Sequence, residues 1–312
     1  MLTQEEIDFY IQFKTMIIYP NKRLCPNKAV SYPISQYNPF LWIANGNTEF
    51  SAFCIDGFII NKEKKVNGIF QKLEYKGAIR SIEIEEIIDF MGEQNLISSI
   101  KLAKQTKTLY RLFVWPFNFP QGYSDTEAFI QSFDLDISPS GKGIVVNRKL
   151  NITLLQLSAG IEKLRGSSFN SVKPLKVGTS FVECYLANNT FNPWPGDADA
   201  ILFSNTLNVP SHIIEFKTHN IDKPTEDEFI GKYGTEDWRR FDVLFNLQNN
   251  LYVNTGYKPK ILYIAWGTKN IPNHKNIKID VIEKGATLST QVFPKPHYDI
   301  FCPDLFDLIS IL

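Results

Sequence analysis

The chain has 312 residues, and its 33 basic and 33 acidic side chains cancel to a net charge of zero. Hydrophobic residues make up 44% and charged residues 21%, a balance that excludes an intrinsically disordered chain. The neutral total also excludes a protein that binds nucleic acid through an overall basic surface, although it is compatible with a local basic cleft.

The four cysteines are Cys25, Cys54, Cys184 and Cys302, and they form no CxxC pair. We interpret them as buried free thiols in a reducing compartment rather than as a disulfide framework or a zinc site. The polar, acidic N-terminus is unlike a secretory signal, and no apolar run reaches membrane-spanning length. These features predict a soluble cytoplasmic protein.

Capping signals and hydrophobic periodicity predict two helices and three strands in the first half of the chain. In order, they are a helix from Thr3 to about Thr15, strands over 50–60 and 69–76, a helix over 81–105 broken at Gly92, and a strand over 108–115. Residues 116–150 carry several Pro, Gly and Ser residues, which predicts a connecting region. The sequence shows no internal repeat.

The second half reads as an α/β sandwich around a small mixed sheet, with room for one more strand around 170–186. In order, the predicted elements are a helix over 153–164, a helix to about 187 with Thr179 or Ser180 as N-cap, strands over 199–204 and 211–217, a helix from about 226 to 253 interrupted near Gly234, and a strand over 260–266.

The most informative pattern lies in residues 196–218. Asp199 directly precedes a short apolar run, and Glu215-Phe216-Lys217 closes the next one. Because side chains alternate along a strand, Glu215 and Lys217 share one face while Phe216 points to the other.

A hairpin centred near Asn208 would set Asp199 directly across from Lys217. Two carboxylates and an ammonium would then meet on one patch. Mg²⁺ prefers carboxylate and water oxygens, and it can polarise a phosphate and activate water. The pattern therefore points to metal-dependent hydrolysis of phosphodiester bonds.

At these residues the chain resembles the PD-(D/E)XK nuclease superfamily, which has the restriction-endonuclease-like fold. The match consists of Gly196-Asp197-Ala198-Asp199 before an apolar strand and Glu215-Phe216-Lys217 at the end of the next strand. It covers about residues 151–267. The resemblance implies that Asp199 and Glu215 bind Mg²⁺ and that Lys217 assists the attacking water.

Members of this family often add a metal-binding Glu from a preceding helix. Glu183 is the candidate for that position, and Glu162 is the second choice. Asp197 is a further candidate ligand and an alternative first acid, or a loop residue that caps a turn. We favour Asp199 as the first acid because the strand starts directly after it.

The helix that follows the Glu-x-Lys strand often carries a basic residue in this family. Arg239 and Arg240 open that helix and are candidates to bind DNA phosphates, with an ordinary solvated helix face as the alternative. His212 and His219 flank the Glu215 strand. We interpret them as surface or supporting residues rather than catalytic bases.

A rival Glu-x-Lys motif occurs in the first half, where Asp56 precedes Glu74 and Lys76 at similar spacing. Alternation places Lys72, Glu74 and Lys76 on one strand face. We interpret that face as solvated, which makes this motif the weaker candidate.

We therefore expect an α/β protein with a restriction-endonuclease-like core over 151–312 and an α+β recognition or dimerisation domain over 1–150. The predicted function is Mg²⁺-dependent, sequence-specific cleavage of double-stranded DNA by a homodimer, as in type II restriction enzymes. One alternative is a nuclease of the same fold that acts on RNA or is controlled by a small ligand. Another is a non-catalytic nucleic-acid-binding module.

Overall fold

A computed structural model describes residues 16–20, 22–31, 38–76, 82–117, 124–170, 172–232, 235–283, 286–297 and 300–312. These residues form a mixed α/β protein with thirteen strands and six α-helices, which confirms the predicted class. None of the helices in these ranges is long and apolar enough to cross a membrane. The helix predicted from Thr3 to Thr15 lies outside the described residues.

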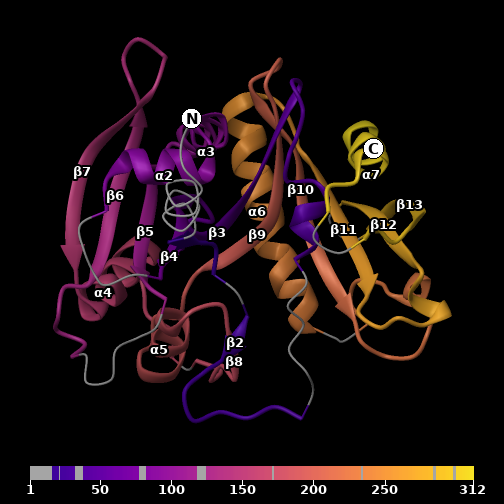
Figure 1. Ribbon diagram of the computed structural model, residues 1–312, viewed down its shortest axis with the longest axis horizontal. Helices are drawn as coiled ribbons and strands as arrows, with labels where there is room; N and C mark the ends of the chain where they lie inside the picture. Colours follow the sequence, from indigo (N-terminus) through magenta and orange to yellow (C-terminus); the bar gives the residue numbers. More distant parts are fainter. Residues whose placement is uncertain are drawn as a thin grey trace, which may run out of the picture. The chain divides into compact units, whose positions relative to one another are not determined.

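The chain forms two compact units, each assembled from separate segments (Figure 1). Unit 1 comprises residues 1–36, 68–100 and 109–195, and unit 2 comprises 37–67, 101–108 and 196–312. Strand β4 and helix α3 begin in one unit and end in the other. The assignment of separate roles to residues 1–150 and 151–312 stays a prediction.

Unit 2 contains six sheet strands in the order β13-β12-β11-β10-β9-β3. The β10–β11 pair is parallel, and the other pairs are antiparallel. The elements are η1 (Pro39–Trp42), β3 (Phe50–Ile60), β9 (Gly196–Ser204), β10 (Val209–His219), η2 (Thr225–Asp227), α6 (Thr235–Thr255), β11 (Lys260–Gly267), η3 (Pro272–His274), β12 (Asn276–Glu283), β13 (Ala286–Pro294) and α7 (Pro303–Ile311).

Alternation along the strands of unit 2 builds two apolar layers. Helix α6 runs along β9 and β10 (Figure 1), and the Phe241 ring on this helix packs 5.7 Å from Tyr263 of β11. Ile214 and Phe216 instead face the core that contains Trp42 and α7. Glu215, between them in sequence, must therefore face α6.

Unit 1 contains the strands β4-β5-β6-β7 in that order, with β1 paired to β4 and a separate β2–β8 pair. The β4–β5 pair is parallel, and the β5–β6 and β6–β7 pairs are antiparallel. The elements are β1 (Ile17–Ile18), β2 (Arg23–Leu24), β4 (Val66–Tyr75), α2 (Ile84–Met91), α3 (Glu93–Gln105), β5 (Tyr110–Pro116), β6 (Ile130–Ile137), β7 (Ile144–Ile152), α4 (Leu154–Arg165), β8 (Val177–Gly178) and α5 (Phe181–Asn189).

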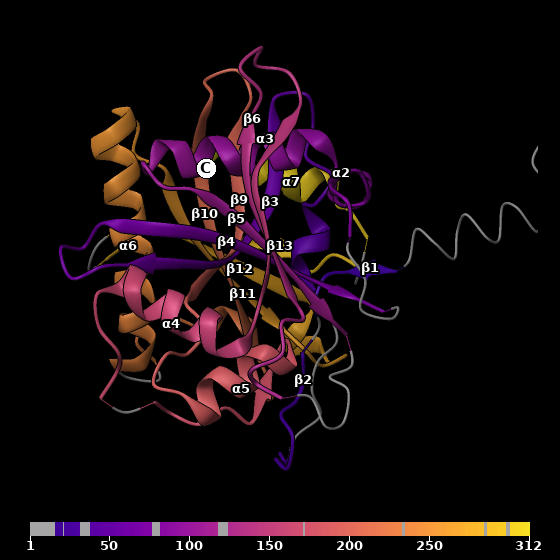
Figure 2. The same cartoon turned by 90° about the vertical axis from the view of Figure 1, so that its left-hand side faces the viewer.

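The helices of unit 1 lie within about three residues of their predicted bounds. Thr153 and Gln156 form a reciprocal capping box at the start of α4, and Gly166 ends this helix with a left-handed backbone. Ser180 caps α5 by accepting a hydrogen bond from Glu183 N. Figure 2 shows α4 and α5 near one end of the unit, with α2 and α3 near the other.

Residues 116–150 are not the predicted connecting region, because they contain strands β6 and β7. The Ser, Pro and Gly residues of 138–143 form the tight turn between these strands, where Gly141 and Gly143 have positive φ angles. Breaker residues mark the end of a strand as readily as a linker, and the sequence alone did not separate the two. Within 170–186, the two-residue strand β8 is followed by the predicted helix, which forms as α5 after its N-cap Ser180.

The order of elements in 50–152 is repeated in 196–294. Each segment begins with two strands joined by a tight turn, β3 and β4 in the first segment and β9 and β10 in the second. A helical part follows, and then a strand that is parallel to the second strand, β5 or β11. Two further antiparallel strands end each segment. Each tight turn contains a residue with positive φ, Lys64 at 58° and Asn208 at 56°. The repeat is one of topology, which explains why the sequence shows none.

Cys25 and Cys184 form a disulfide, which contradicts the interpretation of all four cysteines as free thiols. The two residues are 159 positions apart, but β2 pairs with β8 and brings their Cα atoms to 5.4 Å. Spacing along the sequence carries no signal for such a tertiary approach. Cys54 and Cys302 form no disulfide with any described residue.

Removal of the disulfide should destabilise unit 1, because the bond closes a loop of 159 residues and thereby restricts the unfolded chain. We expect Cys25→Ser/Cys184→Ser to lower the free energy of unfolding by about 2–4 kcal/mol in urea denaturation. Cys54→Ser is the matched control and should retain stability under oxidising conditions. Equal stability of the double variant and the oxidised wild type would contradict the bond.

Candidate active site

The β9–β10 hairpin brings two of the predicted acids together, in a register that differs from the prediction. Ala200 pairs with Ile214, and continuing this register sets Asp199 opposite Glu215 rather than opposite Lys217. The turn lies at 205–208, before the predicted centre, and the ladder shifts by one residue between Pro210 and His212. A bulge of this kind changes which residues face each other across two strands.

Strand β10 is hydrogen-bonded on both sides, to β9 and in parallel to β11, where Glu215 pairs with Tyr263. The preceding residues Ile213 and Ile214 are fully buried. The carboxylate of Glu215 is only 3% exposed because it stands on this central strand beneath α6. β10 is therefore a buried central strand of this unit.

Arg240 on α6 connects three acids. Its Nε lies 2.5 Å from Glu215 Oε1, and its Nη2 lies 3.3 Å from Asp197 Oδ1 and 3.7 Å from Asp199 Oδ1. Arg240 is half exposed, as is Asp197, while Asp199 is 27% exposed. The site therefore reaches from a buried carboxylate to the surface of unit 2.

Asp199 is held at the start of the hairpin by the backbone. Its Oδ2 accepts a hydrogen bond of 2.7 Å from Phe216 N. This bond fixes the Asp199 carboxylate beside the strand residue that follows Glu215, whereas Asp197 lies nearer the surface. Both acids reach Arg240, so either is able to act as the first acid of the motif.

The charges of this cluster oppose one another. Burial raises the pKa of Glu215 well above its usual range, and the nearby Asp199 carboxylate raises it further, while Arg240 acts in the opposite direction. Burial alone would lower the pKa of the Arg240 guanidinium, but the surrounding carboxylates raise it. The carboxyl group of Glu215 therefore keeps its proton to a higher pH than usual, and the guanidinium of Arg240 stays positively charged.

Lys217 lies two residues beyond Glu215 on the same face of β10 and is half-buried. Its backbone pairs with Ala265 of β11, which fixes its position along the strand. Arg239 lies on α6, but its side chain is outside the described residues.

Glu183, the predicted helix acid, lies in unit 1 on α5. Its carboxylate forms a buried ion pair with Lys72 and accepts 2.7 Å hydrogen bonds from Thr179 N and Oγ1. Burial favours the neutral acid, but these partners outweigh it and lower the pKa of Glu183. Glu162, the second choice, accepts a 3.1 Å hydrogen bond from Asn192.

The rival motif lies only partly on a solvated face, because Lys76 is exposed whereas Lys72 and Glu74 are buried. Lys72 and Glu74 are 4% and 0% exposed, and Glu74 forms an ion pair with Arg23. Burial raises the pKa of Glu74 to about 7, against the opposing effect of Arg23. Charged residues alternate along β4 as they do in a surface strand. In the structure, however, Lys72 and Glu74 each form an ion pair with a residue from another part of unit 1.

Glu74 and Glu215 occupy corresponding places in the repeated topology. Each lies on the second strand of its segment, where Glu74 pairs with Trp115 and Glu215 with Tyr263 on the parallel neighbour. The sequence reasoning recognised both motifs but missed their arginine partners. Arg23 carried no motif, and Arg240 was assigned to phosphate rather than to the acids.

The histidines that flank Glu215 are buried rather than on the surface. His212 is 4% exposed, and burial lowers its pKa to about 4. His219 is fully buried, with its Nδ1 2.7 Å from Glu228 Oε2 and its ring 5.4 Å from that of His274. These contacts tie the segment after β10 to the ends of β11 and β12.

Among the described residues, no set of three or more His, Cys, Asp or Glu side chains is arranged as a ready-made metal site. The three acids near Arg240 still offer the oxygen donors that Mg²⁺ uses. Within the described part of the chain, Glu215 Oε2 is buried and has no hydrogen-bond partner. A buried orphan carboxylate oxygen is consistent with a site completed by a cation.

No protein-family model matches the chain, and no characterised protein matches its sequence. Among solved structures, the crystal structure of the sex pheromone staph-cAM373 precursor is 8% identical over 93% of this chain and 89% of that chain, with a TM-score of 0.18. A TM-score this low carries no argument about fold or function.

The raised pKa of Glu215 predicts a pH-dependent stability. Between pH 4.5 and the raised pKa, the unfolded chain loses this proton while the folded chain keeps it, so wild-type stability falls as pH rises. Glu215→Gln removes that loss. The free energy of unfolding of this variant, measured relative to that of the wild type at the same pH, should therefore increase as pH rises above 4.5.

Urea denaturation over a pH series measures this difference. Asp242→Asn, at an exposed position on the same helix as Arg240, is the matched control, and the difference for Glu215→Gln should change more with pH than the difference for Asp242→Asn. Equal pH dependence of the two differences would contradict the perturbed acid.

Proposed function

We propose that the protein is a metal-dependent endonuclease that hydrolyses phosphodiester bonds in double-stranded DNA. The observation that carries the proposal is the convergence of Asp197, Asp199 and Glu215 on Arg240, with Lys217 on the same strand face as Glu215. Two paired strands and one helix hold these groups in unit 2. Perturbed acids that reach from the interior to the surface are typical of active sites.

Asp199 and Glu215 are the residues that would hold Mg²⁺, with Asp197 as an additional ligand. The orphan Glu215 Oε2 and the three-carboxylate donor set fit such an ion. When bound, Mg²⁺ supplies positive charge that polarises a phosphate and activates a coordinated water. Glu183, which already pairs with Lys72 in unit 1, is a weaker candidate for this role.

The remaining side chains of the site have roles that follow from their charge. Lys217 is placed to orient the attacking water or to offset negative charge that develops on the phosphate. Arg240 is half exposed and carries a guanidinium, which pairs with phosphate oxygens in a bidentate way. In this proposal Arg240 exchanges its carboxylate partners for the phosphate of bound DNA.

The finer parts of the proposal rest on the resemblance to PD-(D/E)XK nucleases. They are a restriction-endonuclease-like core, recognition of a specific DNA sequence, assembly as a homodimer, and a cytoplasmic location. The parallel β10–β11 pair joined through α6 supports the core assignment. The Cys25–Cys184 disulfide weighs against the reducing compartment on which the location was based.

Cleavage of a panel of plasmid and phage DNAs tests the proposal. We expect discrete fragments with Mg²⁺ and none with EDTA. Asp199→Ala, Glu215→Ala and Lys217→Ala should each lower the rate by at least about a hundredfold, since each removes a metal ligand or the group that assists water. Asp242→Asn on α6 should cleave at the wild-type rate.

Glu74→Gln separates the two related motifs. It should leave cleavage intact if unit 2 contains the active site. Loss of cleavage in Glu74→Gln but not in Asp199→Ala would assign activity to the rival motif, provided that both variants remain folded. Cleavage of RNA alone would favour the RNA-directed alternative, and metal-independent DNA binding without cleavage would favour the binding module.

A further inference from the structure

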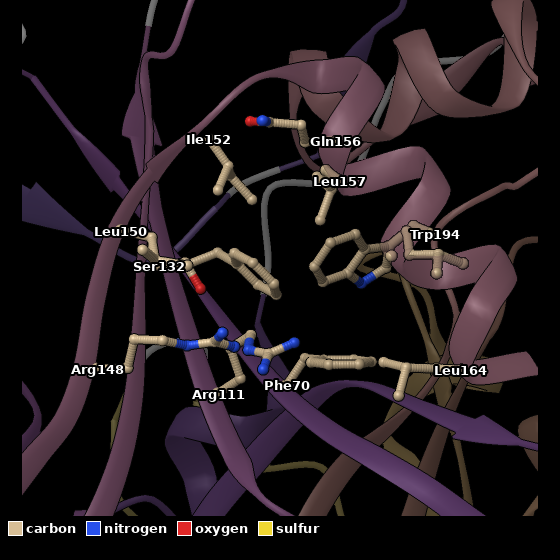
Figure 3. A pocket seen from close by; sticks show the side chains of 13 residues that line it. Phe70, Arg111, Ser132, Arg148, Leu150, Ile152, Gln156, Leu157, Leu164 and Trp194 are labelled. Atoms are coloured by element: carbon tan, nitrogen blue, oxygen red, sulfur yellow. The ribbon is translucent and has the colours of Figure 1, made fainter.

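Unit 1 contains a cavity of about 130 Å³ between its sheet and helix α4 (Figure 3). The side chains that surround it come from β4, β5, β6, β7, α4 and the segment before β9. An engineered cavity of roughly 150 Å³ is large enough to bind benzene, so this cavity is suited to a molecule with a single six-membered ring. The cavity is separate from the proposed active site, and its assignment does not depend on the nuclease activity.

Most of the cavity wall is apolar and aromatic. Trp194 packs against Phe70 and Phe113, with ring centroids 6.1 and 5.8 Å apart. Leu157 and Ile161 of α4 complete this part of the wall. One pair is tilted and the other is edge to face, and aromatic rings packed in this way form a surface for another flat or apolar group.

Two guanidinium groups lie next to each other at one side of the cavity (Figure 3). Arg111 Nε is 2.5 Å from Asp134 Oδ1, and Arg148 Nη2 is 2.9 Å from Asp134 Oδ2. Asp134 is buried, but its two partners outweigh burial and keep its pKa below the usual value. The trio therefore carries one net positive charge beside an apolar space.

Gly160 of α4 keeps part of the cavity open. A Cβ atom at this position would meet no other atom within 4 Å, and the backbone does not require glycine through a positive φ. Glycine inside a helix costs about 0.5–1 kcal/mol relative to alanine. Packing and backbone geometry give no reason for this glycine, whereas space for a ligand does.

We propose that this cavity binds a small organic anion, with a single-ring or similarly sized apolar body against Trp194 and Phe70 and a carboxylate or similar group against Arg111 and Arg148. Arginine pairs with a carboxylate through two parallel hydrogen bonds, which gives the anionic end a fixed orientation. Arg148 is 55% exposed and provides the cationic edge nearest to solvent. Binding of such a molecule would also support the alternative of a ligand-controlled enzyme.

Calorimetric titration with benzoate, cyclohexanecarboxylate and the uncharged analogue benzamide tests the site in the full-length protein. We expect at least one carboxylate to bind at millimolar or lower concentration, and benzamide to bind at least about tenfold more weakly, a difference of about 1.4 kcal/mol. No binding of either carboxylate at millimolar concentration, or equal binding of benzamide, would overturn the proposal.

Two variants localise the binding. Arg148→Gln should weaken carboxylate binding at least about tenfold and leave benzamide unchanged. Lys149→Gln removes the same charge from the neighbouring residue of β7, which pairs with Glu83 and does not line the cavity. It should bind the carboxylate as the wild type does, and an equal loss in both variants would indicate a non-specific charge effect.

Gly160→Leu should fill the cavity and abolish binding, because its side chain grows into open space. Gly160→Ala is the smaller change, and it should raise the free energy of unfolding by about 0.5–1 kcal/mol through helix propensity. Full binding by a folded Gly160→Leu protein would place the ligand elsewhere and overturn the assignment of this cavity.

Discussion

A carboxylate that is taken out of water needs a cation or hydrogen-bond donors, and this requirement shapes both units. The buried acids form ion pairs with basic residues, most of which lie on another strand, helix or loop of the same unit. The described pairs are Glu74 with Arg23, Glu183 with Lys72, Asp134 with Arg111 and Arg148, Glu215 with Arg240, Glu228 with His219 and Lys232, and Asp280 with Lys278. The pairs thus specify which elements meet, while the apolar core supplies most of the stabilisation.

These pairs differ in how completely they are satisfied, and the difference separates structural from functional candidates. Glu183 has a lysine and two hydrogen bonds from Thr179, so it is held as a stable carboxylate. Glu215 has one arginine and an orphan oxygen, as Glu74 does, but two further acids also lie near the arginine of Glu215. Such an arrangement costs stability, and proteins accept that cost where chemistry requires it.

The repeated topology provides an internal comparison for the same argument. Glu74 and Glu215 lie on corresponding strands, both are buried, and both have a raised pKa. Asp197 and Arg240 at the second position are half exposed, which opens the Glu215 cluster to solvent. Glu74 is fully buried, and its partner Arg23 is 24% exposed, less than Asp197 and Arg240, so the second copy is the better candidate for contact with a substrate.

The sequence by itself determined the mixed α/β class, the N-cap of α5, the break at Gly92 and the strands that carry the acids, because capping and alternation are local properties. It also identified Asp199, Glu215 and Arg240 as candidates. The tertiary structure alone decided the hairpin register, the Cys25–Cys184 bond and the burial of β4 charges. The register depends on the bulge beside Pro210 in β10. The disulfide depends on the β2–β8 pairing, and the buried charges depend on oppositely charged partners from other elements. No local pattern encodes which distant groups will meet, since that follows from how the whole chain packs.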